Sequence, residues 1–259
     1  MSGTFTFNSV TSTTMGLVLL DVAKPILSPQ KDISIDIPGY PGSVRSSKKF
    51  IDNNITVNCL IAASSYSDLL TKLKALSAYL YSDDDKVLSF DDESDRYYNA
   101  QHINTVIGKR NCNLYYIDLV FTCNDPFAYD TTATSDNQTI TVNSTTKVIA
   151  NAGQYYAFPI VTITFVQTQT HIYIENDNIA DNRFDISKAF NISDVLIIDC
   201  KNKTIKLNGI ADYSGFGDGG EGLAEWLMLA AGNNSITTGT TDATINVTVN
   251  ISFDKVYFY

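Results

Sequence analysis

The chain has 259 residues, of which 44% are apolar and 18% charged, and its 28 acidic and 18 basic residues give a net charge of −10. This length suits one large β domain or two domains of ordinary size, with enough apolar residues to bury a substantial core. The acidic balance, without clusters of Lys and Arg, excludes a strong nucleic-acid-binding surface, because such surfaces neutralise phosphates with grouped cations.

The first residues, Met1–Phe7, have neither the positive charge nor the long apolar segment of a signal peptide. The sequence also has no apolar run of about eighteen residues, the length that a membrane-spanning helix needs. We therefore expect neither export by the usual route nor membrane insertion.

Alternation of apolar and polar residues dominates the chain. The clearest examples, in chain order, are Ile33–Ile37, Tyr115–Cys123, Val161–Phe165 and Ile245–Phe253. A period of two predicts strands that bury one side and expose the other. Their number, with Gly, Asn and Asp between them, indicates a mainly β protein built from antiparallel sandwiches.

A run with two Pro-Gly breaks follows the first of these strands. Its residues are Ile37, Pro38, Gly39, Tyr40, Pro41 and Gly42. A polar stretch continues to Asn53, and the next core strand begins only near Ile55. Such long excursions are either mobile loops or arms that dock on another subunit. We predict an arm over residues 38–53 that contacts a neighbouring subunit.

A single amphipathic helix is predicted over residues 66–81. Apolar side chains recur there at spacings of three and four, at Tyr66, Leu69, Leu70, Leu73, Leu76 and Leu80. Ser65–Asp68 forms a capping box at its start. Asp83–Asp85 lies beyond its end, where carboxylates oppose the helix dipole. We expect this helix to cover one sheet of the first domain.

A dense acidic turn, Asp91–Tyr98, follows the strand-like residues 87–90. Its carboxylates could bind Ca²⁺, but the spacing of an EF-hand loop is missing. A solvated turn is favoured, with Arg96 paired to Asp91 or Asp92 and one tyrosine in the core.

A domain boundary is predicted near residues 126–137. Pro126 ends a long strand, and residues 130–137 are polar and without pattern, as linkers are. We therefore divide the chain into domains of residues 1–130 and 131–259. The second is expected to be all-β, of jelly-roll or sandwich type, with a hairpin formed by Val195–Cys200 and Thr204–Leu207.

Motifs that would carry chemistry are weak. Gly215–Gly220 matches GxGxxG, but it lies among antiparallel strands and not in a βαβ unit. His102 and His171 are the only histidines, and neither belongs to a catalytic motif. The oxygen-rich loop Glu175–Asp181 is better explained as a turn than as a metal site. We expect no catalytic residue, no cofactor and no metal.

The cysteines and the single tryptophan also have structural explanations. The four cysteines lack CxxC spacing. Cys59 and Cys123 continue the apolar faces of strands, so we expect buried thiols and not disulfide partners. Trp226 could stack on a sugar, but its apolar neighbours favour core packing.

Several segments resemble, in collinear order, the distal tail (Dit) proteins of phages with long, non-contractile tails. The segments that carry the resemblance are Gly16–Pro25, Asp36–Gly42, Tyr66–Tyr81, Phe90–Tyr98, Phe158–Ile160, Ile198–Asp199 and Leu229–Ile236.

The resemblance implies a fold and a role. The first domain is expected to be a β-sandwich with one helix and a projecting β-hairpin, and the second a galectin-like jelly-roll. The implied role is a structural, homohexameric hub in the tail tip of the virion, assembled in the host cytoplasm. Its expected partners are the tail tube, the tape measure protein, the tail-associated lysin or tail fibre hub and receptor-binding proteins. A soluble carbohydrate-binding β-sandwich module is the alternative, and an enzyme is not expected.

Overall fold

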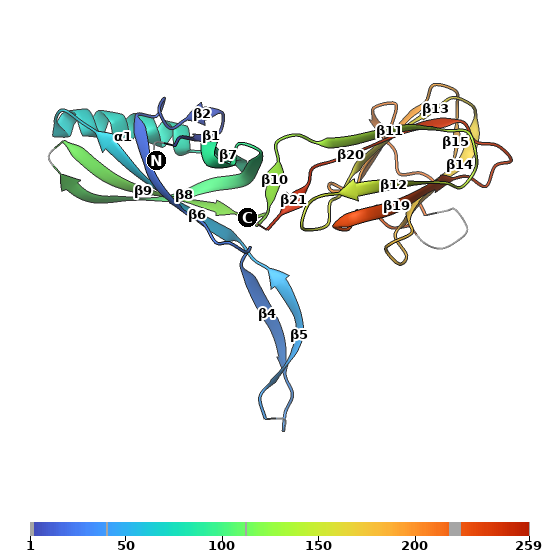
Figure 1. The fold of residues 1–259 in the computed structure, drawn as a ribbon, viewed down its shortest axis with the longest axis horizontal. Helices are drawn as coiled ribbons and strands as arrows, with labels where there is room; N and C mark the ends of the chain where they lie inside the picture. Colours follow the sequence, from blue (N-terminus) through green and yellow to red (C-terminus); the bar gives the residue numbers. More distant parts are fainter. Residues whose placement is uncertain (1–2, 40, 112, 218–223, 259) are drawn as a thin grey trace. The chain divides into compact units, whose positions relative to one another are not determined.

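The computed structural model describes residues 3–39, 41–111, 113–217 and 224–258 (Figure 1). The described residues are mainly β with one α-helix, as the alternating pattern predicted. The chain divides into two compact units, residues 1–131 together with 257–259, and residues 132–256. Within the described part of the chain, no helix has the length and apolar content needed to cross a bilayer.

The elements of the first unit are, in chain order, β1 Phe5–Phe7, β2 Val10–Thr11, β3 Leu17–Ala23, β4 Gln30–Asp36, β5 Ser43–Phe50, β6 Asn53–Ala62, α1 Tyr66–Leu80, β7 Lys86–Phe90, the 3₁₀ turn η1 Asp91–Glu93, β8 Arg96–Asn111, β9 Leu114–Cys123 and β10 Ala128–Asp130. The main sheet has the order β2-β1-β7-β8-β9-β6-β3, and β4 and β5 form a separate two-stranded sheet.

The long strand β8 belongs to both layers of the first unit. Its first residues pair with β7, as far as Ala100 opposite Lys86, and from Gln101 onward it pairs with β9. The two layers meet in an aromatic core, where the ring of Phe121 lies 6.3 Å from Phe5 and 5.0 Å from Phe7. Aromatic side chains bury the largest apolar areas, so this contact stabilises the sandwich.

Helix α1 ends at Leu80, one residue before the predicted end, and buries Leu69, Leu76 and Leu80. Ser65 accepts a hydrogen bond from the backbone N–H of Asp68 at 3.1 Å, as a capping residue should. The Asp68 carboxylate accepts from the Ser64 N–H at 2.8 Å, so the reciprocal bond is shifted by one residue from the predicted box. The prediction that the whole apolar stripe faces the sheet is wrong for Tyr66 and Leu70, whose side chains are 64% and 50% exposed.

The strands of the second unit are β11 Thr134–Ile140, β12 Thr145–Asn151, β13 Ile160–Phe165, β14 Gln169–Asn176, β15 Arg183–Phe190, β16 Val195–Asp199, β17 Thr204–Leu207, β18 Ile210–Ala211, β19 Gly232–Gly239 and β20 Val247–Phe253, and β21 Val256–Tyr257 follows them. One sheet has the order β11-β20-β13-β16-β17-β18 and the other β12-β19-β14-β15. The two sheets face each other across a core in which Phe165 stacks on Phe190 at 4.2 Å. The predicted hairpin is present as β16 and β17.

The expectation of a linker over residues 130–137 is wrong for its second half. Residues 134–137 lie in β11, which pairs with β20 along its whole length, from Thr134 opposite Phe253 to Ile140 opposite Val247. This strand stands at the edge of its sheet and is held by backbone hydrogen bonds. Backbone pairing does not require apolar side chains, so a polar edge strand gives no alternating signal.

Candidate functional site: the exposed hairpin

Strands β4 and β5 leave the main sheet as a hairpin (Figure 1). Their pairing runs from Gln30 opposite Phe50 at the base to Asp36 opposite Ser43 near the tip. Every residue of β4 and all but the last of β5 are exposed. The hairpin therefore makes almost no contact with the rest of its own chain.

The tip contains the residues that the sequence proposed for a subunit contact. Ile37 follows β4, and Pro38, Gly39, Pro41 and Gly42 lie in the turn, whereas Tyr40 lies outside the described residues. Gly39 and Gly42 have φ angles of +80° and +88°. Glycine adopts these left-handed values without steric cost, so the sharp reversal depends on both glycines.

One face of the hairpin is apolar and uncovered. Ile33, Ile35 and Ile37 alternate along the chain, and Val44 pairs directly with Ile35. Their side chains are 44%, 57%, 48% and 42% exposed. The expectation that Ile33–Ile37 is half-buried is therefore wrong, because the face that the pattern assigned to the core has nothing over it in this chain. Exposed apolar surface that is contiguous is the kind that proteins use for interactions.

Charge differs between the two faces of the hairpin. Lys31 and Lys49 pair across the strands on the apolar face, near its base. On the opposite face, Arg45 forms an ion pair with Asp32 at 2.6 Å. The apolar face is thus bordered by two cations, whereas charges of both signs offset each other on the other face.

The base of the hairpin is anchored in the first unit by aromatic contacts. Phe50, at the end of β5, lies 5.1 Å from the ring of Phe127 and 5.7 Å from that of Phe258. The Ser28 hydroxyl donates to the backbone oxygens of Pro126 and Phe258, both at 2.6 Å. These contacts fix the point from which the hairpin leaves the unit.

Two carboxylates of the acidic turn Asp91–Tyr98 bind residues from other parts of the first unit. Thr4 donates to Asp91 through its backbone N–H at 2.9 Å and its hydroxyl at 2.5 Å. Glu93 forms an ion pair with Lys24 at 2.5 Å and accepts from the Tyr98 hydroxyl at 3.2 Å. Burial, followed by the charge of Glu93, raises the pKa of Tyr98 far above its usual range. Asp91 and Glu93, two of the carboxylates that could bind a cation, are therefore used in contacts within the chain.

Arg96 has different partners from those predicted. Its Nε atom lies 3.9 Å from Asp95, and its guanidinium lies 4.2 Å from the centre of the Tyr257 ring. A guanidinium over an aromatic face is a favourable cation–π contact. Arg96 therefore fastens residue 257, near the end of the chain, to the first unit.

The thiols that the structure describes are buried and free. Cys59 and Cys123 are at most 1% exposed, as predicted for small apolar core residues, and Cys200 is buried in the second unit. Burial raises the pKa of each thiol to about 12. Cys112 lies outside the described residues. A buried protonated thiol is unreactive, so these three cysteines act as core residues.

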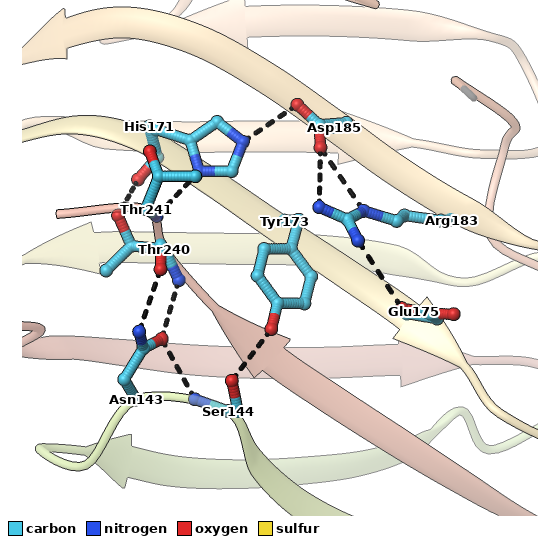
Figure 2. Close-up of polar contacts among 9 residues, drawn as sticks. All are labelled: Asn143, Ser144, His171, Tyr173, Glu175, Arg183, Asp185, Thr240 and Thr241. Atoms are coloured by element: carbon cyan, nitrogen blue, oxygen red, sulfur yellow. Dashed lines mark hydrogen bonds and ion pairs between the residues drawn. The ribbon is translucent and has the colours of Figure 1, made fainter. Parts of the chain in front are cut away.

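A polar network fills part of the second unit (Figure 2). The His171 Nε2–H donates to Asp185 at 2.9 Å, and Nδ1 accepts the backbone N–H of Thr241 at 3.0 Å. Arg183 donates to the other oxygen of Asp185 from Nε at 3.2 Å and from Nη2 at 3.0 Å, and it also approaches Glu175 at 3.7 Å. A backbone N–H only donates, so the proton of the imidazole is on Nε2.

This network has no nucleophile positioned for chemistry. His171 and Asp185 have side chains only 3% and 1% exposed, and their polar atoms are used in the contacts above. The other histidine, His102, is half-buried beside the Thr105 hydroxyl at 2.8 Å, and burial lowers its pKa. Both histidines are therefore hydrogen-bonded within the chain, as the sequence suggested.

Residues of the two loops that could have bound a ligand, Glu175–Asp181 and Gly215–Gly220, make contacts within the chain. In the loop Glu175–Asp181, Asn176 is buried and donates to the Met228 backbone oxygen at 2.7 Å. Gly215 approaches β15 so closely that a Cβ atom would lie 2.0 Å from the Ser187 oxygen. Residues 218–220 of the GxGxxG match lie outside the described residues. Among the residues that are described, no group of three or more His, Cys, Asp or Glu side chains could hold a metal ion.

Trp226 packs within an aromatic cluster. Its ring lies 5.1 Å from Phe216 and 6.0 Å from Phe184, and the residue is half-buried. Its aromatic neighbours are side chains of its own chain, but Trp226 is only half-buried, so the prediction of core packing holds in part.

The alternation in β4 alone does not reveal that this face of the hairpin is uncovered. That alternation predicts a half-buried strand of the core. The strand paired with it, Ser43–Phe50, has only Val44 as an apolar residue before Phe50. A core strand normally has an apolar partner strand, so the polar character of β5 was the signal that β4 lies outside the core.

Comparisons with known proteins agree with the fold. Residues 12–144 match the phage tail protein RIFT-related domain, and residues 152–257 match the C-terminal domain of siphovirus-type tail components. The distal tail protein of Bacillus phage SPP1 is 24% identical over 176 residues, covering 67% of this chain and 68% of that protein.

A solved structure covers nearly the whole chain. The crystal structure of SPP1 Dit, described as a paradigm of hub adsorption apparatus in phages that infect Gram-positive bacteria, superposes with a TM-score of 0.78. It is 16% identical and covers 98% of this chain and 99% of that chain. These matches favour a structural tail component over a soluble sugar-binding module. The chain therefore belongs to the distal tail (Dit) family of siphovirus-type phages, the structural components of the tail-tip hub.

Proposed function

We propose that six copies of this chain form a closed ring at the distal end of the phage tail, with residues 1–130 making the contacts between subunits. The ring joins the tail tube to the host-adsorption apparatus and lines the channel through which DNA is ejected. The protein acts without catalysis, cofactor or metal. Its assembly takes place in the host cytoplasm, before the virion is released.

The observation that carries this proposal is the uncovered apolar face of the hairpin. A head-to-tail contact in which each subunit offers one surface and receives another closes into a ring when the rotation permits. The hairpin supplies the offered surface, through Ile33, Ile35, Val44 and the proposed contact residues of its tip. The similarity to SPP1 Dit, a hub of a phage adsorption apparatus, supports the same role.

The proposed neighbours follow from a hub position in the tail. They are the tail tube protein, the tape measure protein, the tail-associated lysin or tail fibre hub, and receptor-binding proteins. With four basic and two acidic residues over positions 30–50, the hairpin has a net charge of +2, so the rest of the chain has −12. We propose no specific nucleic-acid contact, because an acidic ring repels phosphates.

Mass measurement of the purified chain tests the ring. We expect light scattering coupled to size exclusion to give six times the 28.5 kDa of one chain. Replacing residues 31–49 by two glycines should leave a folded monomer, because Gln30 and Phe50 are paired neighbours at the base and Phe50 keeps its anchor. A wild-type chain that stays monomeric at every concentration, or a shortened chain that still forms rings, would contradict the proposal.

A further inference from the structure

A groove runs between helix α1 and strand β8 in the first unit. Its volume is about 700 Å³, and it is open to solvent. Leu73 and Leu80 of α1 form one wall, and Ile103 and Ile107 of β8 form the other, with Tyr81 at one end. Ile103, Ile107 and Tyr81 are 56%, 52% and 72% exposed. The groove is therefore a concave apolar surface.

Strand pairing explains why the groove is open. β7 pairs with β8 only as far as Ala100, and β9 pairs with β8 on its other side from Gln101 onward. Among the described strands, none pairs with the edge of β8 that faces away from β9 beyond Ala100. Helix α1 lies over this part of β8 and leaves the groove between them.

The charge in the lining of the groove comes from one carboxylate. Asp83 is the single charged side chain among the described residues that line it. Asp84 and Asp85 follow directly and are exposed. His102, which also lines the groove, has a pKa lowered by burial and adds no positive charge at neutral pH. A fitting occupant is therefore apolar with basic borders.

The apolar face of the hairpin has this chemistry. Ile33, Ile35 and Val44 are exposed together, and Lys31 and Lys49 border them without an acidic residue on the same face. Its opposite face is polar, with Arg45 and Asp32 already paired. Only one face of the hairpin thus complements the groove in both polarity and charge.

We propose that the hairpin of one copy lies in the α1–β8 groove of a second copy, with its isoleucine face inward and its two lysines beside Asp83. This assignment rests on the proposed ring and specifies which surface of the neighbour receives the arm. Hydrophobic burial supplies affinity, and the lysine–aspartate pairing fixes the orientation.

Disulfide trapping tests the contact directly. In a chain with Cys112→Ser, we expect Ile35→Cys combined with Ile103→Cys to give covalent multimers after mild oxidation of the ring. A disulfide needs Cα atoms within about 7 Å, so trapping reports proximity. Ser34→Cys with Ile103→Cys is the matched control, because Ser34 is on the polar face, and it should remain uncrosslinked.

A second pair distinguishes the groove from the open face of the same sheet. Tyr116 of β9 is 40% exposed and does not line the groove. If Ile35→Cys traps Tyr116→Cys and not Ile103→Cys in rings that form normally, the groove assignment is overturned while the ring stands. If the wild-type chain forms no ring, the proposed function itself fails.

Charge exchange gives an independent test. Asp83→Lys alone, or Lys31→Glu with Lys49→Glu, should weaken self-association about tenfold, which corresponds to about 1.4 kcal/mol. Combining the three substitutions should restore most of the loss. Lys48→Glu, on the polar face of the hairpin, is the control and should leave assembly unchanged. Absence of rescue in a folded triple variant would refute the pairing.

Discussion

Asp185 joins two basic side chains in the interior of the second unit. It accepts from His171 and from Arg183, and its own side chain is 1% exposed. Removing one partner of a buried pair leaves an uncompensated polar group, so we expect Asp185→Ala to cost about 3–5 kcal/mol of unfolding free energy. Urea titration followed by the fluorescence of Trp226, the single tryptophan, reports on this unit.

Glu175→Gln is the control for that measurement. Glu175 pairs with the same arginine at 3.7 Å, but its side chain is 39% exposed. Exposed ion pairs contribute about 0–1 kcal/mol, so this variant should remain near wild-type stability. Equal losses in the two variants would show that burial of Asp185 does not matter.

The buried thiols give a prediction about pH and reactivity. A raised pKa favours the protonated thiol, and with values of about 12 for Cys59, Cys123 and Cys200 the reactive thiolate is scarce at pH 8. In a Cys112→Ser chain, we expect no reaction with a disulfide reagent until urea unfolds the protein, after which three thiols per chain should react. Fast labelling of the native chain would contradict this.

At the scale of single elements, the N-cap of α1 is testable. Ser65 accepts the Asp68 N–H at 3.1 Å, and loss of such a cap costs about 0.5–2 kcal/mol. We expect Ser65→Ala to speed amide hydrogen exchange across Tyr66–Leu80, measured by mass spectrometry, because α1 starts there. Ser65→Asp keeps an accepting oxygen and should exchange like wild type. No difference between the two variants would mean that packing alone holds the start of the helix.

For the whole molecule, the net charge of −10 predicts how DNA behaves in the proposed ring. A lumen that is neutral to acidic repels phosphates, so DNA slides through without binding. We expect no retention of duplex DNA by the purified ring in filter-binding assays at low salt. Retention that weakens steeply with added salt is the signature of counterion release from a basic surface and would reverse the prediction.

The sequence by itself determined the local structure of this protein. Period-two alternation located the strand at Tyr115–Cys123 and, apart from its first two residues, the strand at Ile245–Phe253. Three- and four-residue spacing located α1, because these repeats follow from backbone geometry alone. Two Pro-Gly breaks predicted an arm over residues 38–53, but the hairpin spans residues 30–50 and the breaks lie at its tip. The collinear motifs then indicated the family that the comparisons confirm.

Only the tertiary structure decided which apolar faces are covered. Ile33–Ile37 and Ile245–Phe253 have the same alternation, yet the first is exposed and the second lies in the core. The sequence pattern also did not predict the polar strand β11 or the hydrogen bond between His171 and Asp185. Each depends on a partner elsewhere in the sequence, β20 for β11 and Asp185 for His171. Burial depends on the surface that lies opposite, which the alternation within one strand does not specify.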